Sequence, residues 1–230
     1  MAGSLKPVTK QCTKKILNQM ENSFYKININ EEKSLLGIFS HFKNDKINIP
    51  VLIIDKYIKF ENIDKSIKVF INNERKIINL GNVKYHNKEY NITILEIIEN
   101  KNININYLEI DDLIYENDSE MYYSNESIYT IHCNNKNNIL VSYNSMKEIN
   151  KSIIIYNYKT DSKYGFNITL NSNNNKIIGI NKGNINNKCI FIKDLINEFI
   201  IEYKYSNKCI NSFKNDKNLK NEIDISHYLL

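Results

Sequence analysis

The sequence predicts an all-β fold framed by helices. Segments 66–71, 76–80 and 91–97 are short, rich in β-branched residues and separated by Asn, Asp, Gly and Lys turns. The chain of 230 residues contains 16 Tyr, 9 Phe and no Trp, and such aromatics favour strands. Many short strands with frequent turns indicate a β-sandwich or a pair of β-barrels.

A helix is predicted near the C-terminus, over residues 192–204. Its apolar residues recur at helical spacing, at positions 192, 195, 196, 199, 200 and 203. Asp194 would lie in the first turn, where the helix dipole favours a negative charge. Residues 205–230 are polar and end in three apolar residues. They are expected to form either a loose tail or a docking segment.

Three strings carry a resemblance to a known family. They are residues 49–57 (IPVLIIDKY), 89–97 (EYNITILEI) and 176–183 (KIIGINKG). In this order and at this separation they resemble the trypsin-like, chymotrypsin-fold serine peptidases of AT-rich eukaryotes and their viruses, whose strings read like LPVLITNNHVL, EYDITIIEI and NKVIGIHKG. The abundance of Asn and Lys, with Arg75 as the only arginine, also suggests an AT-rich genome.

The resemblance spans about residues 11–204 and implies two antiparallel β-barrels. We expect an N-terminal extension and helix over 1–23, a first barrel over 24–115, a second barrel over 120–191, and the helix 192–204 packed across both.

The catalytic triad implied by the resemblance is replaced at each position. Tyr57 stands where the family has histidine, Asn91 where it has aspartate, and Phe166 near the GSSGSP nucleophile loop, or Asn167 if the loop shifts by one residue. A phenol, with a pKa of about 10 in water, is a weak general base near neutrality. An amide carries no charge to stabilise an imidazolium, and neither Phe nor Asn supplies an attacking atom.

The oxyanion hole is also expected to be degraded, because only Gly165 survives among the family's small loop residues. The resemblance therefore implies a catalytically inactive pseudopeptidase. We expect such a protein to act as a protein-binding or structural module, since the groove between two barrels can still receive an extended peptide.

A rival interpretation is a new activity on the same fold. Tyr143 and Lys147 have the Tyr-x-x-x-Lys spacing of viral nucleases that resemble chymotrypsin-like proteases and cleave cyclic dinucleotides without metal. The alternative reading of Lys147 is a solvated lysine near the end of a strand. The two interpretations differ in whether Tyr143, Lys147 and a histidine converge within about 4 Å.

Charge and composition limit the partners. The net charge of +5 comes from scattered lysines rather than a clustered basic face, so a protein or peptide partner is expected and nucleic acid is not. The sequence shows no signal peptide and no apolar run of membrane-spanning length, which predicts an intracellular, cytoplasmic protein.

The cysteines and histidines do not predict a metal site or a cofactor. Cys12, Cys133, Cys189 and Cys209 are far apart and form no close pair, so free and mostly buried thiols are expected. The four histidines show no metal-ligand spacing either, and His132, which follows an alternating strand, is predicted to be a packed residue.

Overall fold

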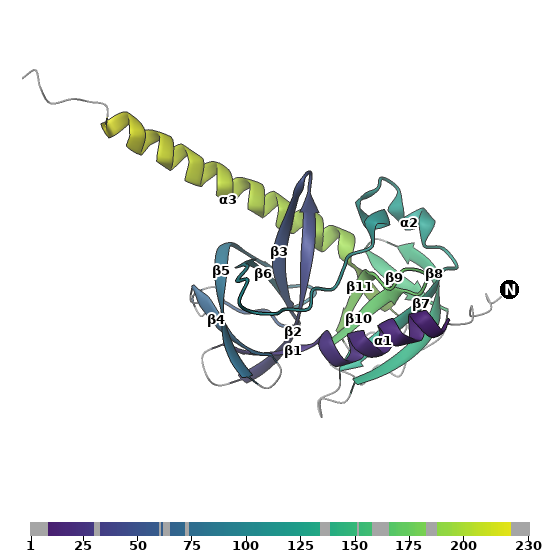
Figure 1. Ribbon diagram of the computed structural model, residues 1–230. Helices are drawn as coiled ribbons and strands as arrows, with labels where there is room; N and C mark the ends of the chain where they lie inside the picture. Colours follow the sequence, from purple (N-terminus) through teal and green to yellow (C-terminus); the bar gives the residue numbers. More distant parts are fainter. Residues whose placement is uncertain are drawn as a thin grey trace, which may run out of the picture.

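Two closed six-stranded antiparallel barrels make up most of the molecule, with one helix before them and one after them (Figure 1). The computed structural model describes residues 9–29, 33–59, 61, 65–71, 74–133, 139–150, 152–157, 166–182 and 188–221. The predicted all-β class with two barrels is confirmed.

The two barrels repeat one strand order. The first contains β1 (Tyr25–Ile29), β2 (Lys33–Asn44), β3 (Ile47–Ile54), β4 (Ser66–Ile71), β5 (Glu74–Asn87) and β6 (Ile92–Ile98). The second contains β7 (Ser127–Cys133), β8 (Ile139–Asn150), β9 (Ile153–Tyr156), β10 (Phe166–Asn171), β11 (Ile177–Lys182) and β12 (Lys188–Phe191). Their orders are β1-β2-β3-β6-β5-β4 and β7-β8-β9-β12-β11-β10, and each closes by pairing its first strand with its fourth. Closure leaves neither sheet with an edge strand.

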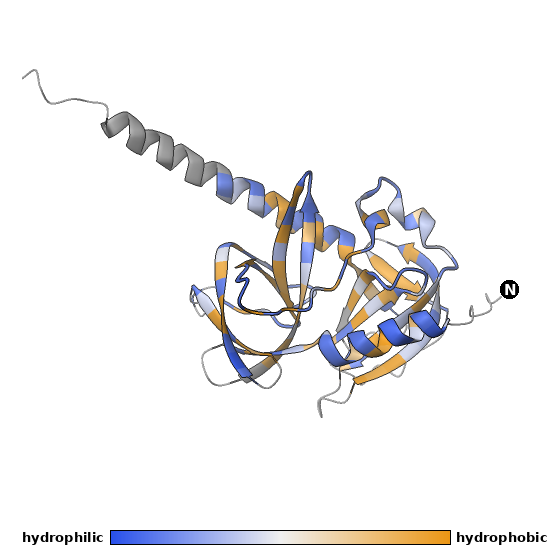
Figure 2. Ribbon diagram, viewed as in Figure 1, coloured by the Kyte–Doolittle hydropathy of each residue, from blue (hydrophilic) through white to orange (hydrophobic). Residues whose placement is uncertain are grey.

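The apolar run in β3 is explained by burial on both faces. Leu52 and Ile54 point into the core of the first barrel, whereas Val51 and Ile53 join a second cluster shared with the other barrel and both long helices. A half-exposed strand would alternate apolar and polar residues, but a strand covered on both sides needs no polar positions. Figure 2 shows this contrast between the apolar strands and the more hydrophilic segment that links the barrels.

That linking segment, residues 99–118, contacts both barrels. The Leu108 amide donates to the Phe39 carbonyl (2.9 Å) in the first barrel, and the Ile177 amide of the second barrel donates to the Glu109 carbonyl (2.8 Å). The segment includes a 3-10 helix, η2 (Asp112–Tyr115), and leads into the short helix α2 (Ser119–Tyr122). The linker therefore helps to hold the barrels together.

The N-terminal helix α1 (Lys10–Asn22) packs on the second barrel. Thr9 caps it by accepting a hydrogen bond from the Cys12 amide (3.2 Å). Cys12 and Ile16 are its buried residues, and Gln19 donates to the Asn175 carbonyl (2.8 Å). The helix thus precedes the first barrel in sequence but covers the second.

The C-terminal helix α3 (Ile192–Asn221) packs across both barrels and is longer than the sequence predicts. Its Phe199 ring meets Phe42 of the first barrel edge to face (5.4 Å between centroids). The predicted end at residue 204, followed by a tail, differs from the observed backbone, which stays helical to Asn221. Residues 205–221 contain neither Gly nor Pro, so no helix-breaking residue interrupts them. None of the helices in the described part of the chain is long and apolar enough to cross a membrane.

A pair of glycine substitutions tests the packing of the second barrel. A Cβ atom at Gly179 would lie 2.8 Å from the Ile190 carbonyl and 2.7 Å from Cys189 Sγ, so we expect Gly179→Ala to destabilise the protein by about 1–3 kcal/mol. The control is Gly81→Ala, whose Cβ meets only the Glu96 side chain among its three nearest atoms and no backbone atom. This control should lower the free energy of unfolding by about 1 kcal/mol or less, which is roughly the contribution of the hydrogen bond from the Val83 amide to Glu96. Urea midpoints measure both, and equal losses would contradict this account of the packing.

Candidate functional site

The structure brings Tyr57 and Asn91 together. Tyr57 follows β3 and is half-buried, and Asn91 ends the turn before β6. The Tyr57 amide donates to Asn91 Oδ1 (2.8 Å). The side chain at the expected aspartate position therefore holds the backbone at the expected histidine position.

Local backbone geometry explains why asparagine suits this turn. Asn91 has φ 53°, in the left-handed region that Asn tolerates better than most residues. Next to it, Thr93 Oγ1 accepts from the Ile58 amide (3.1 Å) and donates to the Lys56 carbonyl (2.6 Å). Side chains of the β6 end thus fix residues 56–58 after they leave β3.

The turn that carries Asn91 is also anchored to α3. The Tyr85 hydroxyl donates to the Glu198 carboxylate, and Asn87 Nδ2 lies 3.4 Å from the same carboxylate oxygen. Burial and the neighbouring Glu198 carboxylate raise the pKa of Tyr85, so the phenol remains a donor at neutral pH. The position of Asn91 thus depends on contacts with a third element.

His86 is the neighbour that the sequence analysis does not single out. Its ring meets the Tyr57 ring edge to face (4.6 Å between centroids), and Lys88 Nζ lies 5.8 Å from the Tyr57 centroid. Desolvation lowers the pKa of His86, which favours the neutral imidazole. His86 reaches Tyr57 because it pairs with Thr93 across β5 and β6, and only a known register would have revealed this.

Phe166 packs in the core. It begins β10, is 1% exposed, and meets Phe24 edge to face (5.8 Å between centroids). Phe24 lies just before β1, so this contact joins the second barrel to the chain entering the first. Lys163, Tyr164 and Gly165, and with them the expected oxyanion loop, lie outside the described residues.

Asn167 belongs to a buried polar row. His132 Nδ1 donates to Asn167 Oδ1 (3.1 Å), which leaves Nε2 to accept from the Ser142 hydroxyl (2.5 Å). Burial lowers the pKa of His132, in keeping with a neutral ring. The row has the donor order of a Ser-His-Asn triad, but His132 is 4% and Asn167 1% exposed. The row gives each ring nitrogen of the buried His132 a hydrogen-bond partner. The prediction that His132 is a packed residue is confirmed.

Tyr143 and Lys147 both lie on β8, and their spacing does not favour a joint site. Four residues of extended strand separate their Cα atoms by about 13 Å. The Tyr143 ring instead packs against Tyr129 (6.4 Å between centroids), and burial raises its pKa. Lys147 is exposed beside an irregularity in the β8–β9 pairing.

Within the described residues, no group of three or more His, Cys, Asp or Glu side chains could hold a metal ion. Cys12, Cys133 and Cys189 are buried and form no disulfide, as the sequence predicts. Burial raises the pKa of the Cys189 thiol to about 12, so this thiol is unreactive as a nucleophile near neutral pH.

Substitutions at Asn91 test its role at the turn. Asn91→Asp keeps an acceptor for the Tyr57 amide and tolerates the left-handed backbone, so stability at pH 7 should change by less than about 0.5 kcal/mol. Asn91→Gly loses only the hydrogen bond, so the free energy of unfolding should fall by about 1 kcal/mol. Asn91→Ala loses the hydrogen bond and also strains the left-handed backbone, so the free energy of unfolding should fall by about 2–3 kcal/mol in total. In denaturant unfolding, the aspartate variant should be the most stable, the glycine variant less stable and the alanine variant the least stable. An alanine variant as stable as the aspartate variant would refute the role of Asn91 at the turn.

Comparison with solved structures shows the fold. The chain is similar to the structure of Deg5, with a TM-score of 0.50 and 12% identity over 82% of this chain and 92% of that one. It is also similar to the inactive form of the Rv3671c protease, with a TM-score of 0.50 and 10% identity over 86% of this chain and 98% of that one. A serine endoprotease from Yersinia pestis aligns less well, with a TM-score of 0.47 and 12% identity over 81% of this chain and 63% of that one. No protein-family model matches the sequence, and no curated protein matches it significantly. The chymotrypsin-like architecture predicted from the three strings is therefore confirmed at the level of the fold.

Proposed function

We propose that this chain is a catalytically inactive pseudopeptidase that acts as a protein-binding or structural module. The observation that carries the proposal is the Tyr57–Asn91 pair, in which the Asn91 side chain accepts a hydrogen bond from the Tyr57 amide (2.8 Å). This pair occupies the places where the resemblance implies the histidine and the aspartate of a triad.

Acyl transfer needs a base that takes the nucleophile's proton and a charge that stabilises the protonated base. Tyr57 offers a phenol, and Asn91 offers a neutral amide whose oxygen is already bonded to backbone. His86 lies close to Tyr57, but burial lowers its pKa, which weakens the ring as a base, and it lies on β5, whereas the resemblance implies a histidine after β3. Phe166 brings no attacking atom and is packed against Phe24.

The same surroundings support a binding role. Tyr57 is half-buried and its ring lies near an exposed lysine, Lys88, in the next turn. A rigid aromatic ring with a nearby cation is typical of residues that dominate protein interfaces. Because α3 anchors the turn, this surface is held in place before any partner arrives, which lowers the entropy cost of binding.

Covalent labelling tests the loss of peptidase chemistry. A fluorophosphonate probe for serine hydrolases should leave the native protein unlabelled, because Phe166 stands where the resemblance implies the activated serine. An active trypsin-like peptidase in the same reaction serves as the positive control. Intact mass spectrometry compares native and heat-denatured samples, and labelling of the native protein alone would show that the nucleophile lies elsewhere in the chain.

Charge reversal tests the binding role. In a pull-down from the native cell, Lys88→Glu should reduce recovery of the main partner about fivefold or more. The substitution replaces the positive charge beside Tyr57 with a negative one, which would repel, or find no opposite charge on, a partner surface that complements Lys88. Lys101→Glu is the matched control, since Lys101 is also an exposed turn lysine, after β6. Quantitative mass spectrometry measures recovery. Equal recovery with both variants would place the binding surface away from Tyr57.

A further inference from the structure

The chain between the two barrels is strongly acidic. Residues 109–126 hold seven carboxylates, and no lysine or arginine occurs from position 102 to position 135. The chain as a whole has a net charge of +5, so this segment differs in sign from the rest of the sequence. It forms η2 and α2, which contact each other near the start of α3 (Figure 1). We call the exposed side chains of residues 112–122 the η2–α2 patch.

Three large side chains in the η2–α2 patch are exposed. Met121 is 77%, Tyr122 55% and Leu113 38% exposed. Glu116 and Asp118 are exposed as well, and among the described residues no cation pairs with either carboxylate. Exposed apolar side chains with polar residues around them mark interaction sites, and Tyr and Met are enriched at protein interfaces. The patch therefore has the composition of a docking surface.

Lysines from other elements neutralise only part of the charge of the patch. Lys43 and Lys176 both pair with Asp112. Lys193 Nζ donates to the Glu116 carbonyl (2.9 Å), which leaves the carboxylate of that residue to solvent. The patch thus keeps unpaired negative charge beside exposed apolar side chains, and it favours a basic partner.

The distal part of α3 carries the opposite charge. Residues 201–221, which we call the α3 arm, hold five lysines and two carboxylates. They form about 30 Å of helix at 1.5 Å per residue. At the start of the arm, Ile201 and Tyr205 are one helical turn apart and are 53% and 65% exposed. A basic helix with exposed apolar side chains is typical of segments that dock on an acidic surface of another protein.

The α3 arm points away from the η2–α2 patch of its own chain. Lys193 Nζ contacts the Glu116 carbonyl and Ser119 Oγ (2.9 Å each), so the patch lies beside the first turn of α3. From residue 193, a straight helix carries residue 204 about 16 Å and residue 220 about 40 Å away. Figure 1 shows α3 running from the side of α2 past the first barrel. Two surfaces of opposite charge are therefore held apart within one chain.

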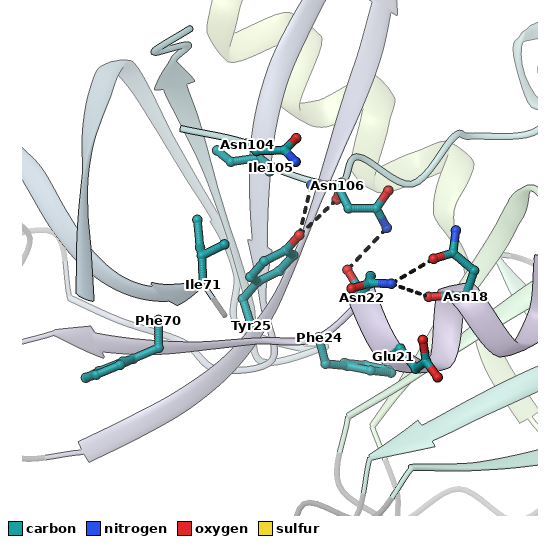
Figure 3. A pocket seen from close by; sticks show the side chains of 10 residues that line it. All are labelled: Asn18, Glu21, Asn22, Phe24, Tyr25, Phe70, Ile71, Asn104, Ile105 and Asn106. Atoms are coloured by element: carbon teal, nitrogen blue, oxygen red, sulfur yellow. Dashed lines mark hydrogen bonds between the residues drawn. The ribbon is translucent and has the colours of Figure 1, made fainter. Parts of the chain in front are cut away.

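A hollow between α1, β1 and the linker offers less to the arm (Figure 3). Its volume is about 330 Å³, and Glu21 is the one charged residue among the ten that line it. Its asparagines bind one another: Asn22 Nδ2 donates to Asn18 Oδ1 (2.7 Å), and Asn106 Nδ2 donates to the Asn22 carbonyl (3.2 Å). One carboxylate offsets little of the charge of five lysines, so charge favours the η2–α2 patch as the docking surface.

We propose that the α3 arm of one copy of this chain docks on the η2–α2 patch of a second copy. The lysines of the arm neutralise carboxylates such as Glu116 and Asp118, and Tyr205 packs against Met121. Two copies related by a twofold axis can each give an arm and receive one, which provides a partner for both surfaces of both copies. The contact uses none of the residues on which the proposed function rests, and it does not depend on the loss of catalysis.

Charge reversal on each surface tests this contact. Lys204→Glu/Lys208→Glu reverses charge on the arm, and Glu116→Lys/Glu120→Lys reverses it on the patch. Each variant alone should associate about tenfold or more weakly than the native chain, because like charges then meet. An equimolar mixture of the two variants should associate again, since every arm then meets a patch of opposite charge in the other variant. Sedimentation velocity of the purified full-length proteins measures the association.

A second pair of lysines provides the control. Lys10→Glu/Lys14→Glu makes the same change of net charge at the same spacing on α1, where both lysines are exposed, and it should change association less than about twofold. Tyr205→Ala should weaken association about fivefold or more, because it removes an exposed aromatic side chain from the contact. Association of the native chain should also fall about tenfold or more between 50 and 500 mM NaCl.

The possible outcomes separate a second copy from other partners. A native chain that sediments as a monomer at about 100 µM in about 50 mM NaCl would overturn the proposal. A mixture of the two charge-reversed variants that associates no better than either variant alone would do the same. Binding to phosphatidylserine vesicles that is lost with Lys204→Glu/Lys208→Glu, in a chain that does not self-associate, would assign the arm to an anionic membrane surface instead.

Discussion

The pairing of β3 with β6 is the constraint on which the rest of the site depends. Ile54 pairs with Thr93, so the end of β3 and the start of β6 lie side by side in the middle of the first barrel. Tyr57 follows the first of these residues by three positions and Asn91 precedes the second by two. Both strands are buried on both faces, so alternate side chains of each strand join two different core clusters. The observed register of the two strands therefore determines that a side chain from one turn meets the backbone of the other.

The two barrels share a strand order but differ in the chemistry of their interiors. The first barrel encloses a cluster of Ile, Leu, Val and aromatic side chains. The second encloses hydroxyl groups as well: the Tyr156 hydroxyl lies 2.6 Å from Thr169 Oγ1, which lies 3.2 Å from Thr130 Oγ1. The row of Ser142, His132 and Asn167 adds to this polar interior. Buried polar groups that are paired cost little, whereas the same groups unpaired would cost several kcal/mol, roughly. A second barrel built in this way depends more strongly on a single correct register than the first.

The sequence predicts the strands of the fold better than it predicts their register and contacts. Strings such as IPVLIIDKY mark β3 and β6 because the double burial of these strands leaves a clear pattern of apolar residues, and the structure then shows that Tyr57 and Asn91 lie side by side at the strand ends. His86 was missed because its contact with Tyr57 depends on which residues of β5 oppose β6, and a long strand with an irregular register does not reveal this. The end of α3 was also missed, because the loss of apolar spacing after residue 203 marks where packing weakens rather than where the helix stops. The direction of Phe166 required the structure, since strand parity at the start of β10 decides whether a side chain faces Phe24 or the barrel interior.

Tyr57, Asn91 and Phe166 all contribute to folding. Asn91 suits a left-handed turn, and its side chain holds the backbone at Tyr57, in the loop that follows β3. Phe166 extends the core of the second barrel toward the chain that enters the first barrel, through its contact with Phe24. The hydrogen bond from Tyr85 to Glu198 ties the same turn to α3. Side chains from both barrels and from α3 therefore hold these positions in place, and a surface that is already ordered loses little entropy when it binds.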